Sequence, residues 1–203
     1  MSSEIASEED VRPPRRKPES LTKLKRAARK LFVERGYHAT RPQDIAREAG
    51  LGHGTFYLHY PDKRACFLAF VEDARTELDE YVQAKIHRDQ PLEELIANSL
   101  HAIFEYSATH PGVLGAAMTD EAVIDAEGAQ ATPLLQRWGR DWANVVRQSA
   151  AQGRSADFYD PDVVGQAILG AIHQAASEAQ RSGRDPEVVV RNLTRFLVRA
   201  LKP

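Results

Sequence analysis

Residues 40–63 read TRPQDIAREAGLGHGTFYLHYPDK, and they predict two short helices joined by a glycine turn. Ile45, Ala46 and Ala49 fall at i, i+1 and i+4, so they share one small apolar face of the first helix. Gly50 stands where a left-handed residue commonly ends a helix. Two helices joined by so short a turn are typical of a helix-turn-helix, in which the second helix enters the major groove of DNA.

The second helix of this motif carries the side chains that we expect to meet DNA, and Pro61 ends it. His53 and Thr55 are expected at base edges, and Gly54 leaves room for a close approach of the backbone. Tyr57 and the basic residues after it are expected mostly at phosphates. The complete predicted DNA-binding set is Thr40, Arg41, His53, Gly54, Thr55, Tyr57, His59 and Lys63.

Residues 40–63, with the helix before them, resemble the DNA-binding domain of the tetracycline-repressor (TetR) family. The matching positions are Gly36, Tyr37, Thr40, Ile45, Ala46, Ala49, Gly50, Leu51, Gly54, Phe56, Tyr57, His59, Tyr60, Lys63 and Phe67. The sequence departs from the family at Gly52, where a capping Ser is common, and at Arg41 and Pro42, where a hydroxyl residue and an apolar residue are usual. Gly is a tolerable N-cap and Pro is favoured at the first helical position, so we expect the fold to survive both changes.

Charge is segregated along the chain. Residues 11–64 hold fourteen Lys and Arg against five Asp and Glu, a net of +9, which leaves −11 for the remainder (13 basic minus 24 acidic). Such asymmetry favours a polyanion-binding end and a non-binding end. Because the basic excess coincides with the helix-turn-helix, the predicted partner is double-stranded DNA.

The composition predicts an all-α protein without a membrane segment. Hydrophobic residues make up 42% and charged residues 28%, and strand-type alternation is hard to find. The single Cys66 and the lack of a signal-like N-terminal segment favour a reducing cytoplasm. No apolar run approaches the ~20 residues that a membrane-spanning helix needs.

We expect three regions: a disordered basic arm over 1–19, a three-helix DNA-binding domain over 20–66, and a C-terminal helical bundle over 67–203. Two interpretations of the arm stay open, insertion into a minor groove or a solvated tail that adds only nonspecific attraction. Ser20 is expected to cap a helix that Gly36 closes.

That first helix should place a basic face over the phosphate backbone, formed by Lys23, Arg26, Arg29 and Lys30. A long helix from Pro61 to about His87 should connect the two domains. Further helices are expected over about 92–109, 134–153, 161–180 and 186–201, and a short helix after Gly112 should reach about residue 118. A loop or short helical turns are expected over 119–132.

Residues for enzymatic chemistry are not apparent. No two of the seven histidines lie at the i, i+3 or i+4 spacing of helical metal ligands, and Cys66 is expected to be a small buried hydrophobe. There is no Walker loop, dinucleotide fingerprint or Gly-x-Ser-x-Gly elbow. We therefore predict no enzyme activity, no cofactor and no metal.

Two interpretations stay open for the aromatic and polar residues of the C-terminal bundle, ordinary core or the lining of an apolar pocket. Similarity to the TetR family implies a small-molecule site in this domain, with an apolar or amphipathic effector. The candidate ligand-binding residues are His101, Phe104, Met118, Trp138 and Trp142.

The last two helices are expected to form a symmetric four-helix dimer interface, because their faces are more apolar than a solvated surface should be. The candidate interface residues are Ala167, Gly170, Ala171, Ala175, Leu193, Phe196, Leu197 and Leu201. Two-fold symmetry implies a roughly palindromic operator. The sequence thus predicts an all-α, homodimeric, effector-responsive repressor. The alternative is an architectural DNA-binding protein whose C-terminal bundle only dimerises.

Overall fold

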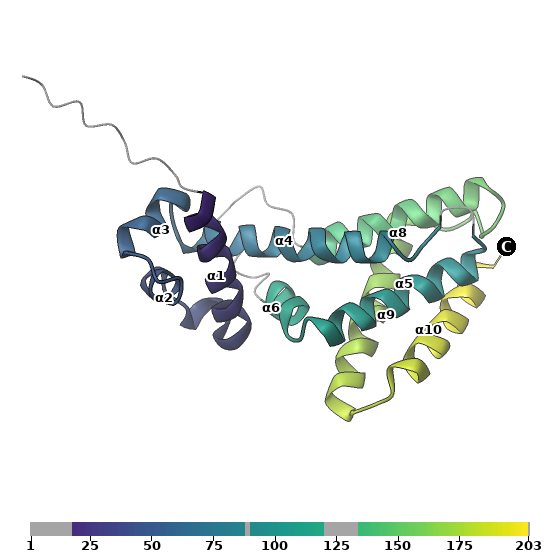
Figure 1. The fold of residues 1–203 in the computed structure, drawn as a ribbon. Coiled ribbons are helices and arrows are strands. Elements are labelled where there is room, and N and C mark those ends of the chain that lie inside the picture. The colour runs from purple at the N-terminus through teal and green to yellow at the C-terminus, as the bar shows by residue number, and fades with distance from the viewer. Residues whose placement is uncertain (1–17, 88–89, 120–133, 203) are drawn as a thin grey trace, which may run out of the picture.

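The computed structural model describes residues 18–87, 90–119 and 134–202, and every regular element in these ranges is a helix. The helices are α1 (Pro18–Ala39), α2 (Pro42–Glu48), α3 (His53–His59), α4 (Lys63–Gln83), α5 (Leu92–Thr109), α6 (Val113–Thr119), α8 (Leu134–Ala151), α9 (Pro161–Ser182) and α10 (Pro186–Leu201). In Figure 1, α1–α3 form a head at one end, and α4 runs from this head into a bundle made by α5–α10. Among the described residues, no helix is long and apolar enough to cross a membrane.

The head has a core of its own. An apolar stripe along α1 is buried, and Leu24, Leu31 and Phe32 are at most 1% exposed. Phe32 packs edge-on against Phe67 of α4, with 5.1 Å between ring centroids. Because a fully buried side chain of this size contributes about 1.5–3 kcal/mol, this core holds α1 to the start of α4.

The predicted glycine turn between α2 and α3 is confirmed. Gly50 has φ 68°, the left-handed conformation that glycine adopts without steric cost. Its N–H donates to the carbonyl of Arg47 at 3.0 Å, and the N–H of Leu51 donates to the carbonyl of Ala46 at 2.9 Å. These two bonds are the paired closure of a Schellman motif, so the sequence at this turn determines where α2 ends.

The predicted cap of α1 is wrong. The helix begins at Pro18, so Ser20 lies in its first turn and is not the N-cap. Its Oγ is instead 2.7 Å from Nε2 of His59, which ties α1 to the end of α3. Gly36, with φ 73°, breaks the regular part of α1 as predicted. Residues 1–17 of the expected arm lie outside the described residues, and its last two residues, Pro18 and Glu19, belong to α1 instead.

Helix α4 belongs to both parts of the molecule. Asp62 caps it by accepting from the N–H of Ala65 at 2.7 Å, and it ends at Gln83, before the predicted position. The predicted domain limit between residues 66 and 67 falls inside this helix. Cys66 is buried as expected, and burial raises the pKa of its thiol to about 12.

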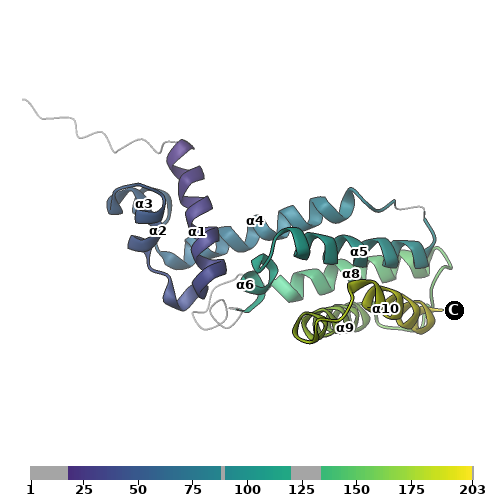
Figure 2. The same ribbon diagram turned by 60° about the horizontal axis from the view of Figure 1, so that its bottom comes forward.

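The bundle closes on a tight crossing of α8 and α9. A Cβ built on Gly165 of α9 would lie 2.3 Å from the carbonyl oxygen of Gly139 in α8, so only glycine permits this approach. Beside the crossing, a second core contains Ile96, Val146 and Ile168. Figure 2 shows α9 and α10 side by side on the face opposite α4. The predicted helices of the bundle are confirmed, whereas nearly all of the expected loop over 119–132 lies outside the described residues.

Candidate DNA-binding surface and effector cavity

The outer side of the head presents most of the side chains that were predicted to read DNA. In α3, His53 and Gly54 are exposed and Tyr57 is 48% exposed, while Thr55 is half-buried. The rings of His53 and Tyr57 meet edge-on at 5.2 Å, so the two residues share one face. Arg41 is exposed at the N-cap of α2. A duplex can therefore reach these residues, and their contact with DNA stays a prediction.

Thr40 has a different position from the one predicted. Its side chain is 0% exposed, and its hydroxyl donates to the carbonyl oxygens of Gly36 at 2.8 Å and Leu31 at 3.2 Å. The hydroxyl thus satisfies main-chain acceptors at the break of α1, where buried polar groups need partners. Thr40 shapes the head, and its side chain does not face DNA.

His59 and Lys63 hold the head together from inside. His59 is half-buried against Ser20. Lys63 donates through Nζ to the carbonyl oxygen of Tyr37 at 2.9 Å, and the same atom lies 4.0 Å from the centre of the Tyr37 ring. Both residues were predicted to contact phosphates. Such contacts would have to form while these hydrogen bonds inside the head are kept.

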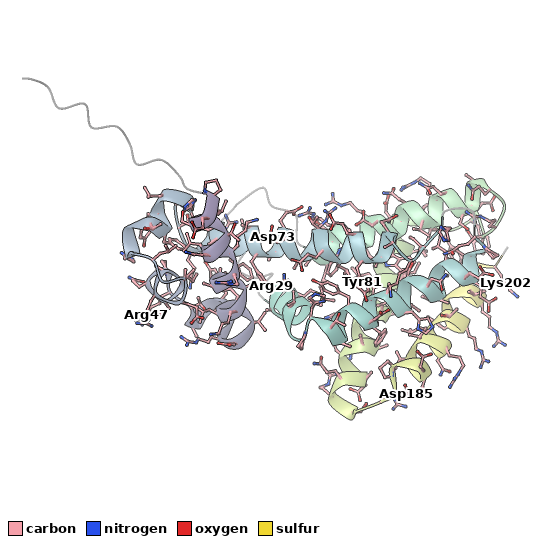
Figure 3. All side chains as sticks on the ribbon, in the orientation of Figure 1. Arg29, Arg47, Asp73, Tyr81, Asp185 and Lys202 are labelled. Carbon is pink, nitrogen blue, oxygen red and sulfur yellow. The ribbon has the colours of Figure 1, made fainter. Side chains whose placement is uncertain are left out.

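The basic face of α1 is largely paired within the chain. Arg29 donates to both carboxylate oxygens of Glu77 in α4 at 2.6 and 2.7 Å, and Tyr106 of α5 donates to the same carboxylate at 3.0 Å. Figure 3 places Arg29 at the junction between head and bundle. Lys30 pairs with Glu48 at 2.7 Å. Arg29 therefore joins three helices, and its predicted phosphate contact competes with that task.

Replacing Glu77 with glutamine should weaken this junction. Burial works to raise the pKa of Glu77, but the hydrogen bonds from Arg29 and Tyr106 outweigh it, so the pKa lies below its ordinary value. We expect a loss of about 1–2 kcal/mol of unfolding free energy at neutral pH, below the usual value for charged hydrogen bonds because the pair is partly exposed. A depressed carboxylate pKa stabilises the fold above the unfolded-state pKa of about 4.3, and this contribution is lost as pH falls through the folded value.

Urea unfolding of the wild type and the Glu77→Gln variant should therefore differ at pH 7 and converge below about pH 4. Glu80→Gln, at an exposed position of the same helix, is the control and should behave as the wild type. An undiminished difference in acid would rule out the ion pair as its cause.

A cavity of about 1160 Å³ lies in the bundle between α4, α5, α6, α8 and α9. Four of the five predicted ligand-binding residues line it: Phe104, Met118, Trp138 and Trp142. Volume and aromatic lining are typical of sites for small organic molecules. Helix α4 contributes Leu78 and Val82, so the cavity borders the helix that carries the head.

His101 does not line this cavity. Its Nδ1 lies 3.4 Å from a carboxylate oxygen of Glu187 in α10, and its side chain is 45% exposed. Each residue turns a helix by about 100°, so His101 points roughly 200° away from Ser99, which does line the cavity. The prediction identified the correct helix and the wrong face.

Several polar residues of the cavity were missed from the sequence. Asp79 and Asp141 line it, and burial is the main cause that raises the pKa of each carboxyl. Ser149 and Arg154 line it at the end of α8. A usable signal existed: Asp141, Val145 and Ser149 follow Trp138 at helical spacing, which puts all of them on one face.

The predicted dimer residues divide into three groups by exposure. Ala167 and Gly170 of α9 are exposed, and Phe196 of α10 is 61% exposed. Leu197 and Leu201 are each 3% exposed and pack in the second core, so they cannot meet a partner chain. The remaining three, Ala171, Ala175 and Leu193, are half-buried. Val163, 65% exposed on α9, was not predicted and adds to the exposed apolar group.

The fold and the exposed α3 define a helix-turn-helix transcriptional regulator with a separate helical bundle. Residues 24–70 match the family model of bacterial regulatory proteins, tetR family. The uncharacterised helix-turn-helix transcriptional regulator YdgC of Bacillus subtilis is 19% identical over 194 residues, which cover 91% of this chain and 94% of YdgC. These matches identify the head as a DNA-binding domain of the TetR family of transcriptional regulators, which is a non-enzymatic family.

Solved structures show the same fold along most of the chain. The fatty acid degradation regulator FadR from Bacillus halodurans superposes with a TM-score of 0.72 at 17% identity, covering 91% of this chain and 97% of FadR. The SmeT–triclosan complex superposes with a TM-score of 0.67 at 16% identity, covering 91% of this chain and 92% of SmeT. Because both superpositions cover most of the chain, the similarity in fold includes the bundle as well as the head.

Proposed function

We propose that the protein is a homodimeric repressor that binds a roughly palindromic operator and is released from it by a small apolar or amphipathic molecule. The observation that carries this proposal is the cavity of about 1160 Å³ beside α4. An architectural protein that only dimerises has no need of such a cavity, because protein interiors are normally close-packed. The SmeT–triclosan complex supports it, since a similar fold there holds a small organic molecule.

Operator recognition is assigned to α3. His53 and Thr55 lie in its first turn and are proposed to meet base edges, while Tyr57 and Arg41 are proposed to meet phosphates. One helix of seven residues reads few base pairs, so a second copy is required for specificity. The exposed apolar residues of α9 and α10 are the proposed contact between the copies.

Release is assigned to α4. Its first turn packs in the head, and its Leu78 and Val82 line the cavity, with no break between these segments. A ligand that displaces the second half of α4 would tilt the head. Two heads must enter successive major grooves about 34–36 Å apart, so a shift of a few ångströms removes contacts without unfolding. A coupling of about 1–3 kcal/mol changes operator affinity roughly 5- to 150-fold.

Selection from a random DNA library tests operator recognition. The wild type should enrich a near-palindrome whose half-sites repeat at about 10–10.5 base pairs or a multiple of it. Thr55→Ala should change the preferred base within each half-site, whereas Arg41→Ala should weaken binding to all sequences alike and lower the salt dependence by about one charge. A uniform loss of affinity in Thr55→Ala would overturn this division of roles.

A further inference from the structure

One end of the cavity holds an arginine that has no carboxylate partner among the described residues. Arg154 follows α8 and is half-buried, and it lines the cavity. Within the described residues, its Nη1 donates to the carbonyl oxygen of Gln90 at 2.7 Å and its Nη2 donates to Oε1 of Gln152, while its Nε is buried without an acceptor. All of these partners are neutral. No described acidic residue contacts the guanidinium of Arg154, so its positive charge is not neutralised by the described part of the chain.

A second unpartnered donor comes from Ser149, whose carbonyl oxygen accepts from the N–H of Arg154 at 2.9 Å. Ser149 lines the cavity and is 2% exposed, and its Oγ has no hydrogen-bond partner among the described residues. The cavity-lining Ser99 and Ser107 instead donate to helix carbonyls four residues earlier, at 2.7 and 2.9 Å. Burying a hydroxyl without a partner is costly, so its partner is expected to come from outside the chain.

We infer that this end of the cavity binds the carboxylate of an amphiphilic monocarboxylic acid. The inference rests on the proposed function, because the same cavity is the effector site. A guanidinium presents parallel N–H groups that match the two oxygens of a carboxylate, and the Ser149 hydroxyl adds a third donor. A doubly charged phosphate fits less well, because the carboxyl groups of Asp79 and Asp141 line the same cavity.

The rest of the cavity fits an elongated apolar body. From Ser149, the residues Val145, Trp142 and Trp138 follow one face of α8 and line the cavity, over a rise of about 16 Å. Phe104 of α5 adds a further aromatic side chain to the lining. A ligand anchored at Arg154 therefore extends its apolar chain toward Trp138, where burial of each methylene favours binding.

Tryptophan fluorescence offers a direct test, since the two tryptophans of the chain both line the cavity. Decanoate, decanol and decylamine share one chain length and differ in the head group. Titration at neutral pH should show decanoate binding roughly 10- to 100-fold more tightly than decanol, the range of a charge-assisted hydrogen bond. Equal affinity for decanol, or tighter binding of decylamine, would overturn the inference.

Two variants test whether the carboxylate of decanoate binds at this end of the cavity. Arg154→Gln and Ser149→Ala should each weaken decanoate binding, by roughly 10-fold or more and by several-fold respectively, and leave decanol binding unchanged. Ser149→Ala also covers the case in which Arg154→Gln fails to fold. It should leave the melting temperature unchanged or raise it, because it removes a hydroxyl that has no partner in the ligand-free protein.

The two controls remove the same kinds of side chain, an arginine and a serine, at positions away from the proposed carboxylate site. Arg147→Gln removes an exposed arginine of α8 that pairs with Asp162 outside the cavity lining. Ser182→Ala removes a hydroxyl of α9 that lies outside the cavity lining and donates to the carbonyl oxygen of Glu178 at 2.9 Å. Both should bind decanoate as the wild type does. A loss in these controls equal to that in the two test variants would contradict the assignment.

Operator affinity, measured separately, distinguishes this inference from the proposed function. Decanoate binding that depends on Arg154 but leaves operator affinity unchanged supports the inference and refutes release by an effector. Release of operator by decanol and decanoate alike, at equal affinity, supports the proposed function and refutes the inference. If both hold, operator must weaken decanoate binding by the same factor by which decanoate weakens operator binding.

Discussion

Replacing Gly54 with leucine is expected to abolish operator binding while leaving the protein folded. Gly54 is exposed in α3, and a Cβ built there meets nothing within 4 Å. A good helix former at this site should stabilise the helix by about 0.5–1 kcal/mol. The leucine side chain would, however, occupy the space through which α3 approaches the base edges. Operator affinity should fall at least about 100-fold, since each base contact that is displaced is worth about 1–3 kcal/mol.

Circular dichroism melting and fluorescence anisotropy with labelled operator check the two halves of this expectation. Thr76→Leu places the same side chain at an exposed position of α4 and should change neither quantity appreciably. A Gly54→Leu protein that binds operator as tightly as the wild type would show that α3 is not in close contact with DNA. A protein that loses binding only because it unfolds would show a lowered melting temperature.

Replacing Phe196 with aspartate is expected to convert a dimer into monomers and to reduce affinity for the full operator by roughly 100- to 10,000-fold. Phe196 is 61% exposed on α10, and Val163 is 65% exposed on the neighbouring α9. These two large exposed apolar side chains lie on the two helices of the proposed interface, where we expect another chain to cover them. A monomer offers one head, so it loses the gain in affinity that comes from linking two binding events.

Sedimentation equilibrium measures the first effect, and operator titration measures the second. Ala171→Arg, at a half-buried position of α9, should give the same result from the other helix of the proposed interface. Arg191→Gln changes the net charge by the same one unit as Phe196→Asp, at another exposed position of α10, and should remain dimeric. A wild-type protein that is monomeric at micromolar concentration would refute the proposed dimer interface.

The sequence by itself determined the features of this protein that arise within a single segment of chain. Gly50 ends α2, and prolines at 42, 161 and 186 stand at the starts of three helices, because these residues restrict the backbone wherever they occur. Helical periodicity likewise determined which side of α1 is apolar. For this reason the helix-turn-helix, the helix order and the family resemblance could all be predicted.

The tertiary structure alone decided what each side chain meets. Thr40 turns inward onto main-chain carbonyls, and Leu197 is covered by the protein's own second core. His101 faces α10, while Arg154 and Ser149 meet at one end of a cavity. Periodicity tells which face of a helix is apolar, but it does not tell which neighbour covers that face. The identity of the neighbour depends on crossings such as that of Gly165 over α8, where distant segments pack together, and these crossings placed the polar groups of the site.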